Sequence, residues 1–112
     1  MNWTPLSQIE QLQHINQQSF IRPQIIFKHS TRCSISKMAF SRLEKFEIPS
    51  GTDFYYLDLL AYRNISNTIA ELYKTHHESP QILIIKNGKC VYTESHSGIN
   101  ANDIVHAIFS AN

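Results

Sequence analysis

The spacing of apolar residues predicts a helix followed by a strand in the first third of the chain. Ile9, Leu12 and Ile15 recur at helical spacing in a glutamine-rich background, which predicts a helix over residues 7–19 after a short start at Trp3. The next apolar run, in the stretch RPQIIFKH, is short and continuous. Such a run is typical of a buried strand.

A second helix and a second strand are expected next. The helix should end within residues 48–51, where IPSG supplies both proline and glycine. The aromatic stretch over residues 53–59 then reads as a strand. The residues expected on the inward face of the helix recur at helical spacing and are Ile35, Met38, Ala39, Leu43 and Phe46.

The last half of the chain predicts a helix, a hairpin and a closing helix. The third helix should run over residues 64–76, with Asn64 as its cap. Residues 82–85 are too apolar for an edge strand, and Asn87-Gly88 is the preferred pair for a two-residue hairpin turn into a strand over residues 90–94. Further expected positions are Ile65, Ile69, Leu72 and Tyr73 facing inward, Asn100 and Asp103 as a cap, and Ile104, Ala107 and Ile108 packing under the last helix.

This order of elements predicts an α/β fold in one domain over residues 1–112. Parallel strands joined by helices, followed by an antiparallel pair and a helix, describe a mixed sheet covered on both faces. The thioredoxin-like fold has this order. We therefore expect a three-layer α/β/α sandwich, with a central mixed sheet of four or five strands flanked by about four helices.

Length and charge restrict the setting and the partners. A chain of 112 residues can bury a hydrophobic core without disulfides. A net charge of +1 provides no strong electrostatic attraction to nucleic acid. The N-terminus has no signal-peptide pattern, and no apolar stretch approaches the roughly 20 residues of a membrane span. We expect a cytoplasmic monomer with no nucleic-acid or membrane partner. In a reducing compartment the two cysteines are free thiols.

Cys33 is the candidate nucleophile because it lies where a buried strand gives way to a helix. In an open α/β sheet, ligand sites lie beyond the carboxyl ends of parallel strands. A helix N-terminus favours thiolate over thiol, and Lys28, His29 and Arg32 would add positive potential if their side chains face the sulfur. A buried, inert cysteine is the alternative. The polar residues around Cys33 favour reactivity, and they are Ser30, Thr31, Arg32, Ser34 and Ser36.

Ser36 stands where a C-x-x-C site would carry its second thiol. That second thiol resolves the mixed disulfide formed by the first. A serine cannot do so, and a thiol from another molecule would be needed to resolve the mixed disulfide. Ser36 could also cap the helix through its hydroxyl, and the two roles are compatible.

Ser79-Pro80 precedes the apolar strand and is a second candidate element. By itself such a proline marks the start of a strand. In thioredoxin-like proteins a cis-proline at this place faces the active cysteine, and the backbone of the preceding residue pairs with the bound thiol substrate. We expect a cis bond at Pro80, with Ser79 in the substrate-pairing place.

Taken together, the motifs FKHSTRCSIS, HESPQILIIKNGKCVY and SHSGI resemble the monothiol bacilliredoxins, the YtxJ-like proteins of the bacillithiol system, over nearly the whole chain. The resemblance implies removal of bacillithiol, or an equivalent small thiol, from S-thiolated client proteins. Cys33 would be the nucleophile and Ser79-Pro80 the substrate-facing loop. The small thiol would be a co-substrate, with no permanently bound cofactor. The family's usual proline after the cysteine is replaced here by Ser34, which leaves the start of the helix less rigidly preset.

Three further residues complete the expectations. Ser95 and His96 follow the returning strand, near where related redoxins hold the polar end of the small thiol, and are candidate binding residues. Cys90 lies within that strand, and we expect it to serve in packing. It could resolve Cys33 only if the two Cα atoms lay within about 7 Å.

Other functions fit the sequence less well. His76 and His77 are adjacent and no cysteine or histidine pair has zinc-site spacing, so we expect no metal site. A cysteine phosphatase or arsenate reductase loop would need arginine where Ala39 stands. A monothiol glutaredoxin-like protein that uses another small thiol stays open, although its C-G-F-S site differs from CSIS. A non-catalytic thioredoxin-fold binding or chaperone module also stays open.

Overall fold

Two strands that are buried along their whole length form the centre of the sheet. They are β2 (Gln24–His29) and β4 (Gln81–Lys86), which pair antiparallel. β3 (Asp53–Asp58) runs parallel to β2, and the two-residue strand β1 (Thr4–Pro5) runs parallel to β3. β5 (Lys89–Ser95) pairs antiparallel with β4, so the order is β1-β3-β2-β4-β5. The computed structural model describes residues 3–47 and 49–110.

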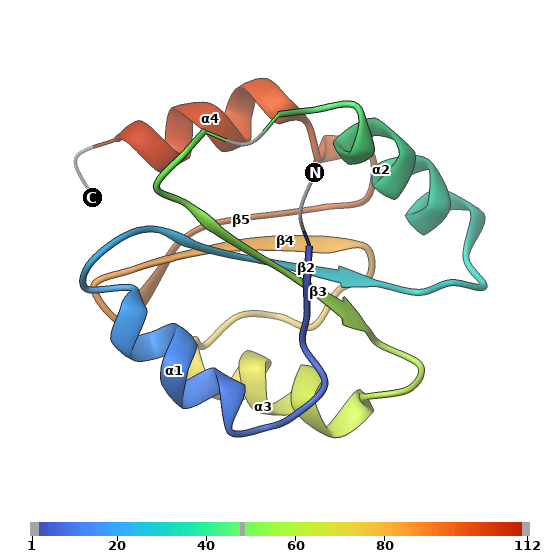
Figure 1. Cartoon of the computed structure of the whole chain (residues 1–112). Helices are drawn as coiled ribbons and strands as arrows, with labels where there is room; N and C mark the ends of the chain where they lie inside the picture. The colour runs from blue at the N-terminus through green and yellow to red at the C-terminus, as the bar shows by residue number, and fades with distance from the viewer. Residues whose placement is uncertain (1–2, 48, 111–112) are drawn as a thin grey trace.

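Four α-helices cover the sheet in two layers (Figure 1). α2 (Ser34–Glu44) and α4 (Ala101–Phe109) lie on one face, and α1 (Gln11–Gln18) and α3 (Arg63–Leu72) lie on the other. A short 3₁₀ turn, η1 (His96–Gly98), links β5 to α4. The expected α/β/α sandwich is confirmed, with five strands in its sheet. In the described part of the chain, no helix is both long and apolar enough to span a membrane.

The alternation of β2 divides the core between the two faces. Ile25 and Phe27 belong to the cluster under α2 and α4, whereas Ile26 belongs to the cluster under α1 and α3. Successive strand residues point to opposite faces, so His29 continues the α2 face and Lys28 the α3 face. This alternation decides which polar residues reach the end of the sheet near Cys33.

The hairpin and the last helix follow the sequence prediction. Asn87 and Gly88 have φ values of 53° and 76°, as a two-residue turn of the predicted kind requires. The amide of Asp103 donates to Oδ1 of Asn100 over 3.0 Å, which confirms the cap of α4. Asn100 also donates to the Asp103 carboxylate over 2.7 Å, so each residue of the pair satisfies the other.

The first helix is shorter than predicted. It starts at Gln11, because the side-chain oxygen of Gln11 accepts hydrogen bonds from the amides of Ser7 and Gln8 and holds the preceding residues in turns. Ile9 therefore lies outside the helix and is 42% exposed. Its expected inward position is wrong, whereas Leu12 and Ile15 are buried as predicted.

The second helix presents the predicted face only in part: Ala39 and Leu43 are buried as expected, whereas the inward positions predicted for Ile35 and Met38 are wrong. Ser36, Ala39 and Leu43 are buried, whereas Ile35 and Met38 are 49% and 62% exposed. The helix ends at Glu44, before the predicted breakers, and Phe46 is half-buried beyond it. Ile48, which falls in the predicted end, lies outside the described residues.

The third helix also ends early. It stops at Leu72, and Lys74 adopts a positive φ of 53°, which turns the chain out of the helix. Leu72 is 49% exposed, so its predicted inward position is wrong, although Ile65, Ile69 and Tyr73 are buried. The N-cap position is Tyr62, and Asn64 lies inside the helix.

Candidate active site around Cys33

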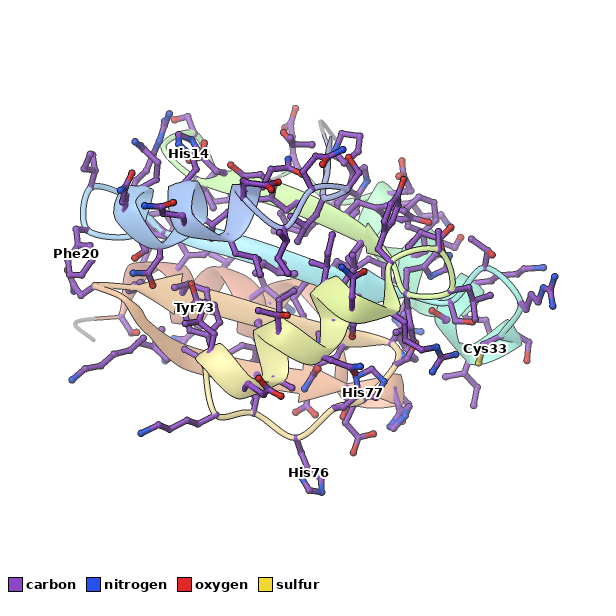
Figure 2. The ribbon with its side chains drawn as sticks, turned by 90° about the horizontal axis from the view of Figure 1, so that it is seen from below. His14, Phe20, Cys33, Tyr73, His76 and His77 are labelled. Carbon is purple, nitrogen blue, oxygen red and sulfur yellow. The ribbon has the colours of Figure 1, made fainter. Side chains whose placement is uncertain are left out.

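Cys33 is the N-cap residue of α2, at one end of the molecule (Figure 2). Its backbone is extended, with φ −99° and ψ 125°, and its carbonyl accepts from the amide of Lys37 over 3.0 Å. Its own amide donates to the carbonyl of Ser30 over 3.2 Å, which closes the turn before the helix. The residue is partly exposed. A thiol at this place meets both the positive end of the helix and solvent.

The turn that carries Cys33 is held by the side chain of Ser36. The Oγ of Ser36 accepts from the amide of Ser30 over 3.0 Å and lies 2.7 Å from Nδ1 of His29. A hydroxyl can donate one hydrogen bond and accept two, so the tautomer of His29 sets which partner donates in this pair. The expected helix cap does not form, since this hydroxyl bonds the preceding loop. Ser36 is fully buried and is committed to these two partners.

His29 is buried and neutral rather than a source of positive charge. Burial lowers its pKa, an effect that outweighs the opposing influence of the Asp58 carboxylate. Its ring lies among three aromatic rings, with centroid distances of 5.6 Å to Phe27, 5.2 Å to Phe40 and 5.5 Å to Tyr56. The expected contribution of His29 to the potential at the thiol is therefore wrong, and the residue orders the turn instead.

Lys28 points away from the helix that carries Cys33. Its ammonium donates to the carbonyl of Ser66 in α3 over 3.1 Å, on the opposite face of the sheet. The side chain is fully buried, and burial lowers its pKa to about 8. The structure does not bring Lys28 to the α2 face. Thr31, Arg32 and Ser34 are exposed on either side of Cys33.

The Ser79–Pro80 segment reaches the same edge of the sheet. The peptide bond between the two residues is cis. Gln81, which follows, pairs with Lys28 at the end of β2, so Pro80 lies just beyond the last paired positions. The hydroxyl oxygen of Ser79 is buried and has no hydrogen-bond partner in the described part of the protein.

Ser95 and His96 join this segment to α2. Ser95 pairs with Gln81 at the end of β5, and the amide of His96 donates to the carbonyl of Pro80 over 3.0 Å. The exposed His96 ring lies 3.4 Å from the carboxylate of Glu78. Arg42 of α2 donates to the carbonyl of His96 over 3.4 Å. His96 therefore stands at the predicted edge, tied to both the proline loop and α2.

Sequence reasoning missed Arg42, Glu78 and Ser66. Arg42 also donates to the carbonyl of Ile99 over 3.1 Å, a link across 57 residues that no local pattern reveals. Glu78 lies directly before the Ser79-Pro80 pair, and this neighbourhood is the one sequence feature that could have indicated a place for Glu78 in the site. In the described residues, no group of three metal-binding side chains lies close enough to hold an ion.

Cys90 lies at the far end of the sheet from Cys33. It pairs with Ile85, which pairs with Gln24 at the start of β2, whereas Cys33 follows the end of that strand. Five residues of strand separate the two levels, or roughly 16 Å at about 3.3 Å per residue. The thiol of Cys90 donates to the carbonyl of Tyr92 over 3.3 Å, and burial raises its pKa. This separation is far beyond disulfide reach.

Comparison with known proteins identifies the family. A family model described as "Monothiol bacilliredoxin BrxC" matches residues 4–104. The chain belongs to this family. BrxC membership indicates a bacilliredoxin-like thiol–disulfide function and agrees with the resemblance of the three motifs.

Solved structures confirm the thioredoxin-like fold. A protein described as having a thioredoxin fold and a proposed oxidoreductase role is 32% identical, with a TM-score of 0.81 over 92% of this chain and 90% of that chain. Thioredoxin from Malassezia sympodialis is 20% identical, with a TM-score of 0.72 over 96% of this chain and 88% of its own. Mitochondrial thioredoxin 3 from Saccharomyces cerevisiae is 16% identical, with a TM-score of 0.73 over 95% of this chain and 92% of its own. These two thioredoxins support the fold alone.

Proposed function

We propose that this chain is a monothiol thiol–disulfide oxidoreductase that removes a small thiol of the bacillithiol class from S-thiolated client proteins. The observation that carries the proposal is the contrast between residues 33 and 36. Cys33 is partly exposed at the N-terminus of α2, whereas Ser36 is buried and hydrogen-bonded to His29. This arrangement supports a nucleophile without a resolving partner. The proposed setting is the cytoplasm, with the protein acting as a monomer.

The proposed reaction has two exchange steps. The Cys33 thiolate attacks the small-thiol sulfur of a client mixed disulfide, a new S–S bond forms to Cys33, and the client sulfur leaves as a thiolate that takes up a proton. A second small thiol then attacks, as its thiolate, the sulfur now attached to Cys33. The products are the symmetrical small-thiol disulfide and free Cys33. The client sulfur gains one electron and the second small thiol loses one, while the first small-thiol sulfur stays at the disulfide level throughout, so the electrons balance.

The surface around Cys33 supports access by a protein client. Ile35 and Met38 are exposed on the first turns of α2, and Leu60 is 39% exposed just after β3. Exposed apolar side chains beside a reactive group favour contact with another protein chain. The Ser79–Pro80 segment would accept the extended backbone of the client, with Ser95 and His96 beside the small thiol.

The test uses a purified client protein that carries bacillithiol on one cysteine. Wild-type protein with free bacillithiol should restore the client thiol, as measured by mass spectrometry over time. Cys33→Ala should abolish this release, while Cys90→Ala should keep the wild-type rate because Cys90 lies at the other end of the sheet. Full activity of Cys33→Ala would leave only the non-catalytic binding or chaperone function. Release of glutathione from a glutathionylated client, without release of bacillithiol, would favour the glutaredoxin-like alternative.

A further inference from the structure

Three basic side chains gather where β2, α3 and the loop before β4 meet. Nζ of Lys28 donates to the carbonyl of Ser66, and Oγ of Ser66 lies 3.2 Å from Nδ1 of His77. Arg63 is the first residue of α3, one turn before Ser66. Partial burial lowers the pKa of His77, the charges of Lys28 and Arg63 lower it further, and only the Glu78 carboxylate opposes them. The local field is therefore positive.

The charge of Lys28 has no anionic partner in the described protein. The ion pairs found among residues 3–47 and 49–110 join Arg22 to Asp53 and His96 to Glu78, and neither includes Lys28. A fully buried ammonium without a counter-charge is costly, since its hydration is lost and no carboxylate replaces it. Such a group contributes little to folding stability. Its presence at the edge of the sheet calls for a functional explanation.

The loop before β4 also offers donors that are not in use. The hydroxyl oxygens of Thr75 and Ser79 are buried and have no hydrogen-bond partner within the described residues. A hydroxyl can donate one hydrogen bond, and buried hydroxyls are normally paired. Two unpaired hydroxyls in the segment that contains His77 therefore point, together with the basic groups, to a place for an oxygen-rich anion.

This basic cluster adjoins the end of β2 that precedes Cys33. The amide of Leu59 donates to the carbonyl of His29 over 2.9 Å, which ties the approach to α3 to the end of β2. Figure 2 shows Cys33 at one end of the molecule, Phe20 at the other, and His77 between them. The end of β3, which leads to α3, and the start of β4, which follows the loop of His77, both pair with the end of β2 that precedes Cys33.

We propose that Lys28, Arg63 and His77 form a subsite for a carboxylate of the small thiol. The exposed side chains of Arg63 and His77 would contact the carboxylate directly. The buried ammonium of Lys28 would add positive charge from the protein interior without touching the carboxylate. The subsite deepens the proposed function, because it assigns an anionic group to the co-substrate. The bound anion would also supply the counter-charge that Lys28 lacks. Any neutral or cationic small thiol would be a poorer co-substrate.

Proton linkage gives the subsite a distinctive signature. The groups that face His77 are Lys28 from β2, Arg63 from α3 and Glu78 from its own loop. A carboxylate bound beside them would favour the protonated imidazole and raise the pKa of His77. By the same linkage, binding should tighten as the pH falls from 8.0 to 6.5, a range in which the carboxylate itself stays ionised.

The test is an NMR titration of the uniformly ¹⁵N-labelled protein with succinate, with neutral succinamide as the matched probe. Succinate should shift the amides of Arg63, Ser66 and His77 in a saturable way, and more tightly at pH 6.5 than at pH 8.0. The double variant Arg63→Gln/His77→Gln should weaken binding about tenfold, since it removes a full charge and an imidazole. Lys74→Gln/Lys89→Gln, which removes two exposed charges elsewhere, is the control and should bind as wild type.

The outcomes separate the subsite from the proposed function. Absence of saturable shifts, equal shifts with succinamide, or unchanged binding by the double variant would each overturn the subsite. Release of bacillithiol from a client by wild-type protein in the same case would leave the proposed function standing. Conversely, specific succinate binding without any release of a small thiol would support the anion site and overturn the proposed exchange activity. Competitive inhibition of release by succinate would support both.

Discussion

Replacing Lys28 with methionine should make the protein more stable at neutral pH. The ammonium is fully buried, and its pKa falls from 10.5 to about 8. A difference of roughly 2.5 units corresponds to roughly 3 kcal/mol against the folded state at pH 7, at about 1.4 kcal/mol per unit. The hydrogen bond to Ser66 opposes this by about 1 kcal/mol. Methionine has a similar length and no charge, so Lys28→Met should gain about 2 kcal/mol.

The pH dependence provides the stricter test. The folded-state pKa of Lys28 lies below the unfolded value, so the penalty is fully present below pH 8 and disappears as the pH rises toward 10.5. Lys28→Met should therefore exceed wild type by about 2 kcal/mol at pH 7, or about 8 °C in Tm for a chain of this size. At pH 10.5 the two proteins should be nearly equal.

Urea unfolding at the two pH values measures both quantities. Lys89→Met, which removes an exposed lysine at the opposite end of the sheet, is the control and should change the free energy of unfolding little at either pH. A Lys28→Met protein that is less stable than wild type at pH 7 would refute the reasoning, because the ammonium would then stabilise the fold. A gain that is as large at pH 10.5 as at pH 7 would show that packing, not charge, is the cause.

Three further predictions concern the turn around Cys33 and the second thiol. Ser36→Ala should lose about 2 kcal/mol in urea unfolding, because buried partners of its hydroxyl are left unsatisfied, whereas the exposed Ser34→Ala should lose less than about 0.5 kcal/mol. The free energy of unfolding of the wild type should fall as the pH drops below about 6.5, because the pKa of His29 is lowered in the folded state and the unfolded chain takes up the proton more readily. His29→Phe should lose part of this pH dependence, and a variant with the same dependence as the wild type would contradict the prediction. Cys90 should react slowly with iodoacetamide at pH 7, because burial raises its pKa, so rapid labelling of Cys33→Ala protein would contradict its buried role.

The sequence predicts best the elements whose signals are local. Continuous apolar runs marked β2 and β4, and the Asn87-Gly88 pair marked the hairpin because its positive φ values suit those two residues. Asn100 was recognised as a cap since its partner Asp103 lies three residues away. The position of Cys33 at the junction of β2 and α2 followed from the same kind of local reading.

The first turns of α2 depart from the predicted face, although Ala39 and Leu43 are buried as predicted, because a contact with the preceding strand competes with the hydrophobic pattern. Helical spacing placed Ile35 and Met38 inward, yet the hydrogen bond between Ser36 and His29 rotates the polar serine into the interior. The burial of Lys28 was equally hidden. A lysine at the end of a strand normally reaches solvent, and only the packing of α3 over the sheet encloses this one.

The inward serine also bears on how such a site changes during evolution. A single substitution of Ser36 by cysteine would restore the two-cysteine spacing, but sulfur is a weak hydrogen-bond acceptor and donor. The amide of Ser30 and the ring of His29 would then lose a strong partner. Conversion to a dithiol enzyme would therefore demand compensating changes at position 29 or 30. The hydrogen bonds of Ser36 with Ser30 and His29 therefore favour keeping serine at this position.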